Sequence, residues 1–191
     1  MVRLKIHLAP DEQTVQFCRQ VNAQVRSITD SAIVFSETSP MLPHITLAMG
    51  ELLPSQTFAA LTTGIQTLAQ EVQPLTLRLS QPYIEPVHGR YILCDIQENS
   101  ALTALRTRLS ERILGTYLTT QESRSFVPHL TLAHIDAQRE QVHASLQLVK
   151  VISQTICAHI EIAHVGPKGT CIDGLVTCNL AHSLGSAKHD R

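Results

Sequence analysis

The chain has 191 residues, of which 43% are hydrophobic and 16% are charged, and its formal net charge is −1. This composition is typical of a soluble globular protein with a sizeable core. A net charge so close to zero argues against an extended grip on nucleic acid, which requires many phosphate contacts. No apolar run approaches the roughly 20 residues that cross a bilayer, so we expect no membrane partner.

The five cysteines favour a reducing compartment. Their number is odd and their spacing shows neither a Cys-x-x-Cys pair nor a Cys/His finger, so reduced thiols are a better interpretation than disulfides. The first residues alternate like a strand and lack the apolar block of a signal peptide. We therefore expect a cytoplasmic protein, and we expect it to be a monomer.

The first half of the chain predicts strands alternating with helices. Residues 2–8 alternate between apolar and polar side chains, as an edge or half-buried strand does. A helix follows Pro10 and Asp11, and a short strand is expected at 33–35. Pro54 predicts the first turn of a second helix, whose apolar positions run from Phe58 to Val72. Strands at 75–79 and 91–96, joined by a turn at 86–90, close this half.

The second half repeats this order. Asn99 predicts the cap of a third helix, and Asp136 that of a fourth helix running through Val142, Leu146 and Val149. The last strands are expected at 156–165 and 172–180, joined by a turn at 166–169. We predict one α/β (α+β) domain built from pseudo-repeats at about 1–97 and 98–182, with mostly antiparallel sheets. The tail from 183 to 191 is expected to fray.

One phrase occurs in both halves. Pro43-His44-Ile45-Thr46-Leu47-Ala48 and Pro128-His129-Leu130-Thr131-Leu132-Ala133 differ at one position, where one large aliphatic residue replaces another. On a strand, the histidine and the threonine of each phrase share one face, and the aliphatic residues point to the other. Duplication makes a functional interpretation more convincing than a single half-buried His-x-Thr would be. The two pairs are therefore expected to meet across a groove.

These paired phrases, at this separation, resemble the motifs of the two-histidine phosphoesterase superfamily, which includes 2′,5′ RNA ligase-like proteins and cyclic nucleotide phosphodiesterases. The resemblance covers nearly the whole chain. It implies a bilobal, pseudo-symmetric fold around a central cleft with helices outside. It also implies that His44 protonates the leaving oxygen, that His129 activates water, and that Thr46 and Thr131 bind phosphate. Many ligase-like members have an arginine after the second motif, where this chain has His134.

The chemistry can also be argued from the residue types. Opening a cyclic phosphate requires a base for the attacking water and an acid for the departing ribose oxygen, and imidazole serves both roles near neutral pH. Threonine hydroxyls can donate to the phosphate oxygens as charge develops there. The residues alone do not assign acid and base. We expect hydrolysis of a small cyclic nucleotide, a cyclic ADP-ribose phosphate or an RNA terminus, without metal or cofactor. Three alternatives remain: 2′,5′ ligation, a binding module without turnover, and a phosphorylated substrate that is not a nucleotide.

Other candidate substrate-binding residues are less well defined. Arg124 and Phe126 could hold a phosphate and stack on a base, although Phe126 could equally belong to the core. Arg90 and Tyr91 lie beside the first predicted hairpin turn, and Lys168 lies in the second. His7 is a candidate cleft residue on the first strand, although a solvated polar face is the simpler interpretation. Simple alternation predicts that His134 points away from His129 and is structural.

Overall fold

The computed structural model describes residues 2–119 and 126–181. Its helices are α1 (Glu12–Arg26), α2 (Phe58–Ala69), α3 (Ser100–Arg112), α4 (Arg139–Leu146) and the 3-10 turn η1 (Pro167–Gly169). Its strands are β1 (Arg3–Ala9), β2 (Met41–Leu42), β3 (Ile45–Glu51), β4 (Leu75–Arg78), β5 (Tyr83–Ile84), β6 (Tyr91–Asp95), β7 (His129–His134), β8 (Gln154–Cys157), β9 (His159–Val165) and β10 (Cys171–Asn179).

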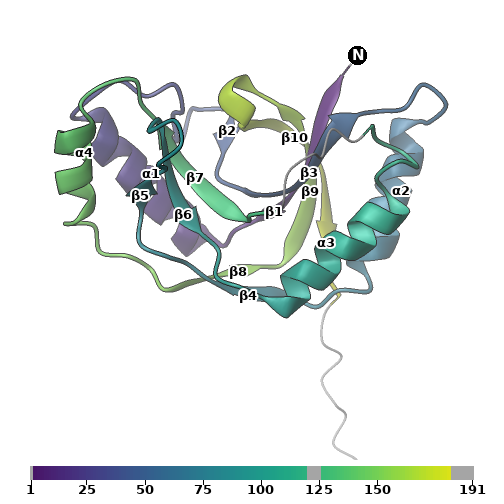
Figure 1. Ribbon diagram of the computed structural model, residues 1–191. Coiled ribbons are helices and arrows are strands. Elements are labelled where there is room, and N and C mark those ends of the chain that lie inside the picture. Colours follow the sequence, from purple (N-terminus) through teal and green to yellow (C-terminus); the bar gives the residue numbers. More distant parts are fainter. Residues whose placement is uncertain (1, 120–125, 182–191) are drawn as a thin grey trace, which may run out of the picture.

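One sheet of eight strands holds both halves together. Its order is β2-β10-β9-β1-β3-β7-β6-β5, and every registered pair is antiparallel, which confirms the predicted sheet type (Figure 1). β1 lies inside this sheet, between β9 and β3, so the prediction of an edge strand is wrong. The alternation of β1 is misleading because Lys5 and His7, which look solvated in the sequence, are both buried.

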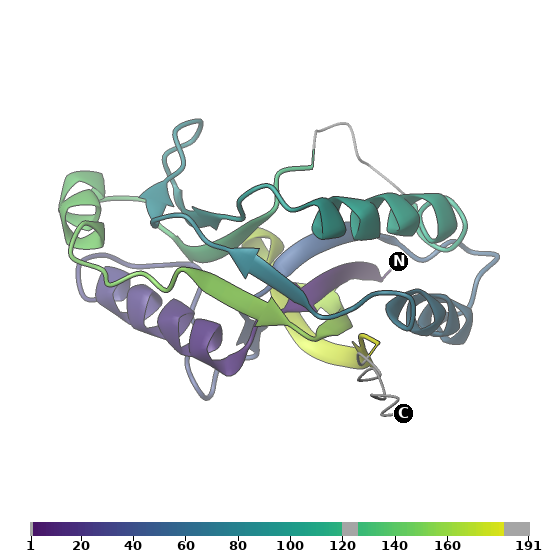
Figure 2. The same cartoon turned by 90° about the horizontal axis from the view of Figure 1, so that it is seen from below.

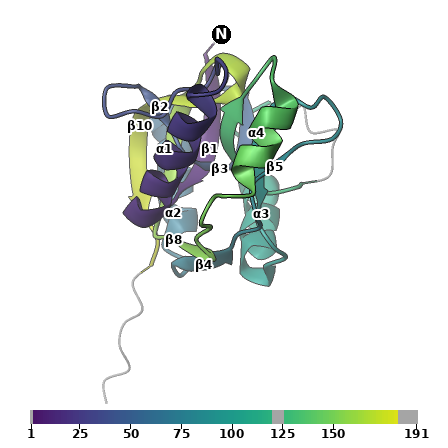
Figure 3. The ribbon, with the colours of Figure 1, turned by 90° about the vertical axis from the view of Figure 1, so that its left-hand side faces the viewer.

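Two pairs of helices cover the apolar side of the sheet. α1 packs against β7 and against α4, which in turn contacts β5, whereas α2 packs against β9, β10 and α3 (Figures 1 and 3). Each pair therefore combines one helix from each half of the sequence. The helices bury aliphatic side chains on the strands, among them Ile6, Ile45 and Leu130, in one continuous core. None of the described helices is long and apolar enough to cross a membrane.

A second, two-stranded sheet lies between the helix pairs. β4 pairs with β8, and Figure 2 shows the two strands crossing the underside of the molecule. The predicted pairing of residues 75–79 with 91–96 is confirmed only at the bridge between Leu79 and Ile96, and the hairpin partner of β6 is β5. The single strand predicted at 156–165 is also divided, because β8 joins β4 whereas β9 joins the large sheet. The hairpin of β9 and β10 is confirmed.

Two of the predicted helix starts are confirmed and two are wrong. Asp11 accepts from Thr14 N at 2.9 Å, and Asn99 accepts from Leu102 N at 2.9 Å, as capping residues do. α2 begins at Phe58 after its cap Thr57, so Pro54 lies before the helix and not in its first turn. α4 begins after Gln138, which lies in the left-handed region at φ 58° and makes no side-chain cap bond, whereas the side chain of Asp136 forms an ion pair with Arg90.

Candidate active site

The two repeated phrases lie side by side at the centre of the large sheet. β3 and β7 pair with Ile45 opposite Leu130, and both of these side chains are fully buried in the core. Their neighbours in sequence therefore point to the other side of the sheet, which we call the motif face. Extending the register by one residue in each direction places His44 opposite Thr131 and Thr46 opposite His129. The duplication thus gathers two imidazoles and two hydroxyls in one patch.

Each motif strand carries a β-bulge at the same position of its phrase. On β3, His7 and Ile6 oppose Thr46 and Ala48, so Leu47 is an extra residue. On β7, Leu93 opposes Thr131 and Ile92 opposes Ala133, so Leu132 is an extra residue. An extra residue reverses the alternation of side chains beyond it. The duplication therefore includes the backbone irregularity as well as the letters of the motif.

The bulge on β7 brings His134 onto the motif face. His134 opposes Tyr91 and His129 opposes Asp95, and Tyr91 and Asp95 share a face because they are four residues apart on β6. The rings of Tyr91 and His134 meet edge to face, with centroids 4.8 Å apart. The prediction that His134 points away from His129 is wrong, because simple alternation does not account for the extra residue.

A buried asparagine of α1 supports this bulge. Asn22 donates from Nδ2 to the carbonyl of Leu132 at 2.8 Å and to that of Ile33 at 2.9 Å, and its Oδ1 accepts from Phe35 N at 3.0 Å. These bonds satisfy backbone groups that a regular ladder would otherwise pair. They also explain why residues 33–35, predicted as a strand, form none: part of their backbone binds a side chain instead.

Both motif histidines are held in the same orientation. Nδ1 of His44 lies 2.8 Å from the carbonyl of Leu42, and Nδ1 of His129 lies 2.9 Å from that of Val127, in each case two residues earlier. Because a carbonyl only accepts, Nδ1 carries the hydrogen in both rings. Nε2 of each neutral ring is then a proton acceptor at the far end of the imidazole. This arrangement is suited to proton transfer.

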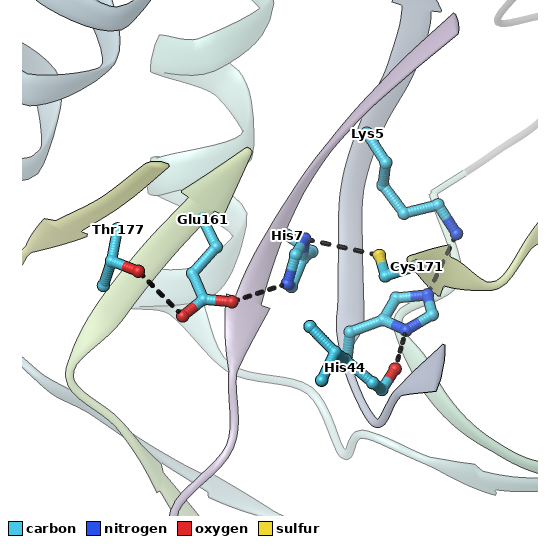
Figure 4. A network of polar contacts seen from close by, with 7 residues as sticks. Lys5, His7, His44, Glu161, Cys171 and Thr177 are labelled. Carbon is cyan, nitrogen blue, oxygen red and sulfur yellow. Dashed lines mark hydrogen bonds and ion pairs between the residues drawn. The ribbon is translucent and has the colours of Figure 1, made fainter. Parts of the chain in front are cut away.

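Lys5 binds the acceptor nitrogen of His44. It is 2% exposed, and its Nζ lies 2.9 Å from Nε2 of His44 (Figure 4). It also donates to the carbonyl of Gly169. No motif in the sequence marks Lys5 as part of the site. Alternation along residues 2–8 placed it on a polar face, and only the central position of β1 brings that face against His44.

His7 forms a second buried contact beside His44. The two rings lie edge to face with centroids 5.4 Å apart. Nε2 of His7 donates to Glu161 at 3.1 Å, and its Nδ1 faces Sγ of Cys171 at 3.4 Å (Figure 4). The other carboxylate oxygen of Glu161 accepts from Thr177 at 3.2 Å. His7 is fully buried, so the solvated interpretation is wrong, and its contacts are with this network.

Burial governs the protonation of this side of the patch. It holds the pKa of His44 well below its usual value, and the nearby Lys5, His7 and His129 lower it further. Burial also lowers the pKa of Lys5 and of His7, although Glu161 opposes the shift at His7. The pKa of Cys171 is raised to about 12, again by burial, so its thiol is protonated and can donate to Nδ1 of His7.

The neighbours of His129 are different. Its cross-strand partner is Asp95, whose carboxylate accepts from the hydroxyl of Tyr83 at 2.8 Å. Burial and this bond raise the pKa of Tyr83 to about 12, so the phenol stays protonated. No motif in the sequence marks Asp95 as part of the site. The only signal was its place at the end of an alternating strand.

The remaining predicted residues lie in varied surroundings. Arg90 is exposed, with Nη1 3.4 Å from Asp136. Lys168 is exposed in the turn between β9 and β10. Phe126 packs against the core, and the guanidinium of Arg106 lies 5.5 Å from its ring centroid. Arg124 lies outside the described residues. Tyr91 is half-buried on the motif face, and of this group it lies nearest in register to the motif strands.

Within residues 2–119 and 126–181, no group of three or more His, Cys, Asp or Glu side chains is arranged to hold a metal ion. The polar groups on the motif face are imidazoles, hydroxyls, one ammonium group and the carboxylates of Asp95 and Glu161.

Comparisons with known proteins agree with this geometry. The model of the 2′-5′ RNA ligase superfamily matches residues 7–164. TT0787 of Thermus thermophilus superposes with a TM-score of 0.66 at 17% identity, over 95% of this chain and 99% of that one. E. coli LigT complexed with 3′-AMP gives 0.59 at 15% identity, over 95% and 99%. Kluyveromyces marxianus Usb1 gives 0.51 at 11% identity, over 93% and 98%. No curated protein sequence matches significantly.

Proposed function

Because the chain belongs to the 2′-5′ RNA ligase superfamily, we propose that it is a metal-independent phosphodiesterase that opens a cyclic phosphate. The substrate would be a 2′,3′-cyclic nucleotide, a cyclic ADP-ribose phosphate or an RNA terminus. One observation carries this proposal: the imidazoles of His44 and His129 are fixed by equivalent backbone bonds on one face of adjacent strands, each opposite a threonine.

The reaction would proceed by in-line attack of water on phosphorus. A bond forms from the water oxygen to phosphorus, the bond to one ribose oxygen breaks, and the product is a phosphate monoester. One imidazole takes the proton of water and the other gives a proton to the leaving oxygen. The hydroxyls of Thr46 and Thr131 would donate to the non-bridging oxygens, where charge develops. One proton exchanged with solvent resets the pair.

The assignment of roles follows the family resemblance, with His44 as acid and His129 as base. The surroundings of His44 restrict when it can act as the acid. Its pKa is depressed in the free protein, so it must gain a proton as the substrate binds. A phosphate anion beside the ring favours this change, because an opposite charge stabilises the imidazolium. The same groups used in reverse, with a 2′-hydroxyl attacking, would give ligation; dilute water favours hydrolysis.

A second candidate function rests on the contact between Lys5 and His44. Nε2 of His44 already accepts a hydrogen bond in the free protein, as it would in a site that binds a nucleotide or RNA end without turnover. Structures of E. coli LigT in complex with phosphate, 3′-AMP, ATP and NADP+ show that a relative with this fold holds such ligands. Binding alone would therefore suit the same surface.

The setting we propose is a cytoplasmic monomer. All five cysteines are free thiols and all are buried, which is consistent with a reducing compartment. Sedimentation of the purified protein at micromolar concentration would test the oligomeric state.

One substrate panel tests the proposal and separates its alternatives. The protein is incubated in EDTA with 2′,3′-cyclic mononucleotides, a cyclic ADP-ribose phosphate and 2′,5′-linked dinucleotides, and products are followed by ³¹P NMR. His129→Ala is the matched inactive control. We expect a cyclic substrate to open in EDTA with wild type and not with the control. Saturable binding without turnover would support the binding module, and turnover that requires added metal would contradict the mechanism.

A further inference from the structure

Lys5 is a buried cation at the edge of the candidate active site. It is 2% exposed on a central strand, and its described polar contacts are Nε2 of His44 and the carbonyl of Gly169. An ammonium group so placed is costly unless an anion neutralises it. Within residues 2–119 and 126–181, no carboxylate lies within ion-pair distance of Lys5. The nearest acidic residue of the network, Glu161, uses its two oxygens on His7 and Thr177.

The positive charge of Lys5 is therefore not neutralised by the described residues, which favours the binding of an anion. The depressed pKa of Lys5 and of His44 has burial as its first cause, and Arg3 acts further on Lys5 in the same direction. An anion placed between Lys5 and His44 would relieve both shifts at once. The charged and titratable groups that face this point come from several elements: Arg3 and His7 on β1, His129 on β7, Glu161 on β9 and Cys171 on β10.

Position in the fold indicates that this anion is the substrate's phosphate. Lys5 shares its strand face with His7, which opposes Thr46. Its contact atom is Nε2 of His44, the atom that would give its proton to the leaving oxygen. Lys5 opposes Met49, which lies three residues after Thr46. The residue three positions after Thr131 is His134, and its partner on β6 is Tyr91. Tyr91 therefore occupies the position that corresponds to Lys5. Within the described residues, the buried cation of the duplicated site therefore lies on the His44 side.

We propose that Lys5 is the phosphate-binding cation of this site: its ammonium group donates to His44 in the free protein and to a phosphate oxygen in the complex. The transfer frees Nε2 of His44, which takes up a proton and becomes the acid. This inference rests on the proposed function for the identity of the anion. It accounts for the requirement that His44 be protonated only when substrate is present.

Binding of inorganic phosphate and 3′-AMP tests the proposal without turnover. Lys5→Gln keeps an N–H donor for His44 and Gly169 but removes the charge, and Lys5→Arg keeps the charge. We expect Lys5→Gln to weaken the binding of both ligands by about 10- to 100-fold, the range of a hydrogen bond to a charged group. Lys5→Arg should retain more affinity than Lys5→Gln. Arg78→Met, which removes an exposed cation of β4 in the separate two-stranded sheet, should change affinity by less than about twofold.

The pKa of His44, followed by NMR of its ring, gives a second readout. Phosphate should raise this pKa in wild type and raise it less in Lys5→Gln. If Lys5→Gln binds phosphate as wild type does, Lys5 only holds the turn at Gly169 and the inference is wrong, even if the enzyme hydrolyses cyclic phosphates. If Lys5 governs phosphate affinity but wild type turns over no substrate, the inference stands and the proposed phosphodiesterase fails.

Discussion

The His44 side and the His129 side of the motif face have the same phrase, the same bulge and the same imidazole orientation, but different neighbours. His44 is 7% exposed and is surrounded by Lys5, His7 and Cys171. His129 is half-buried beside Asp95. Duplication therefore supplies two equivalent proton carriers, and the flanking strands β1 and β6 make them unequal. The different surroundings allow the two imidazoles to take different roles, one as acid and one as base.

Replacing either histidine should have the largest effect. We expect His44→Ala and His129→Ala each to lower kcat by about 10²–10⁴-fold, as loss of a general acid or base does. The double variant should lose much less than the product of the two effects, because the pair acts as a unit. Single-turnover assays in EDTA measure this. Full activity in both single variants would remove the catalytic assignment.

The two alanine variants of the motif histidines should also differ in the free energy of unfolding. His44→Ala deletes a buried ring that bonds Leu42 and Lys5, so it should lower the free energy of unfolding by about 1–3 kcal/mol. His129→Ala deletes a half-buried ring and should cost less. Urea unfolding of the two proteins compares them, and an equal cost would mean that the difference in surroundings has no energetic weight.

The threonines should show the next largest effect on activity. Thr46→Val and Thr131→Val keep the volume and remove a donor, and each should lower kcat by about 10²-fold if its hydroxyl serves developing charge. Both variants should fold, because Ile45 and Leu130 on the other face are unchanged. Thr177→Val, which removes a hydroxyl from the outer end of the same network, is the matched control and should stay near wild type. Equal losses in all three would indicate general damage to the sheet.

The bulge on the His129 side depends on α1. Asn22→Leu fills a similar volume but leaves the carbonyls of Leu132 and Ile33 without their donor, which should cost about 1–3 kcal/mol for each unsatisfied group. Because Leu132 is the bulge residue, activity should fall as well. Activity measured well below the melting temperature separates this shift in geometry from simple unfolding. Unchanged activity would show that the bulge forms without Asn22.

Acid should destabilise the protein through its buried histidines. The pKa values of His44 and His7 are lowered in the folded state, so below about pH 6.5 the unfolded chain binds protons that the folded protein does not. Stability is then lost as pH falls from about 6.5 towards 5, by up to roughly 1.4 kcal/mol per pH unit for each group. Urea unfolding across this range should show the slope, and His44→Gln should reduce it. A flat profile would contradict the assigned burial.

How much of this site the sequence could predict depends on strand order. The shared face of His44 and Thr46, and that of His129 and Thr131, follow from alternation within one strand, and the antiparallel sheet follows from the hairpins. The roles of Lys5 and His7 depend on β1 lying between β3 and β9, which local periodicity does not contain. The position of His134 depends on a bulge that exists only relative to the partner strand β6. The sequence predicted that Asp136 caps α4. Its ion pair with Arg90 could not be predicted, because that contact joins residues far apart in the sequence.

The pH dependence of kcat/KM in EDTA tests most directly whether the two imidazoles form an acid–base pair. For wild type with a 2′,3′-cyclic nucleotide, we expect a bell-shaped profile whose two limbs report the two histidines in the free enzyme. Lys5→Gln should shift the limb that belongs to His44 to higher pH, because a neighbouring cation that opposes its protonation is removed. A profile without limbs between about pH 5 and 9, or activity abolished by EDTA, would contradict the account.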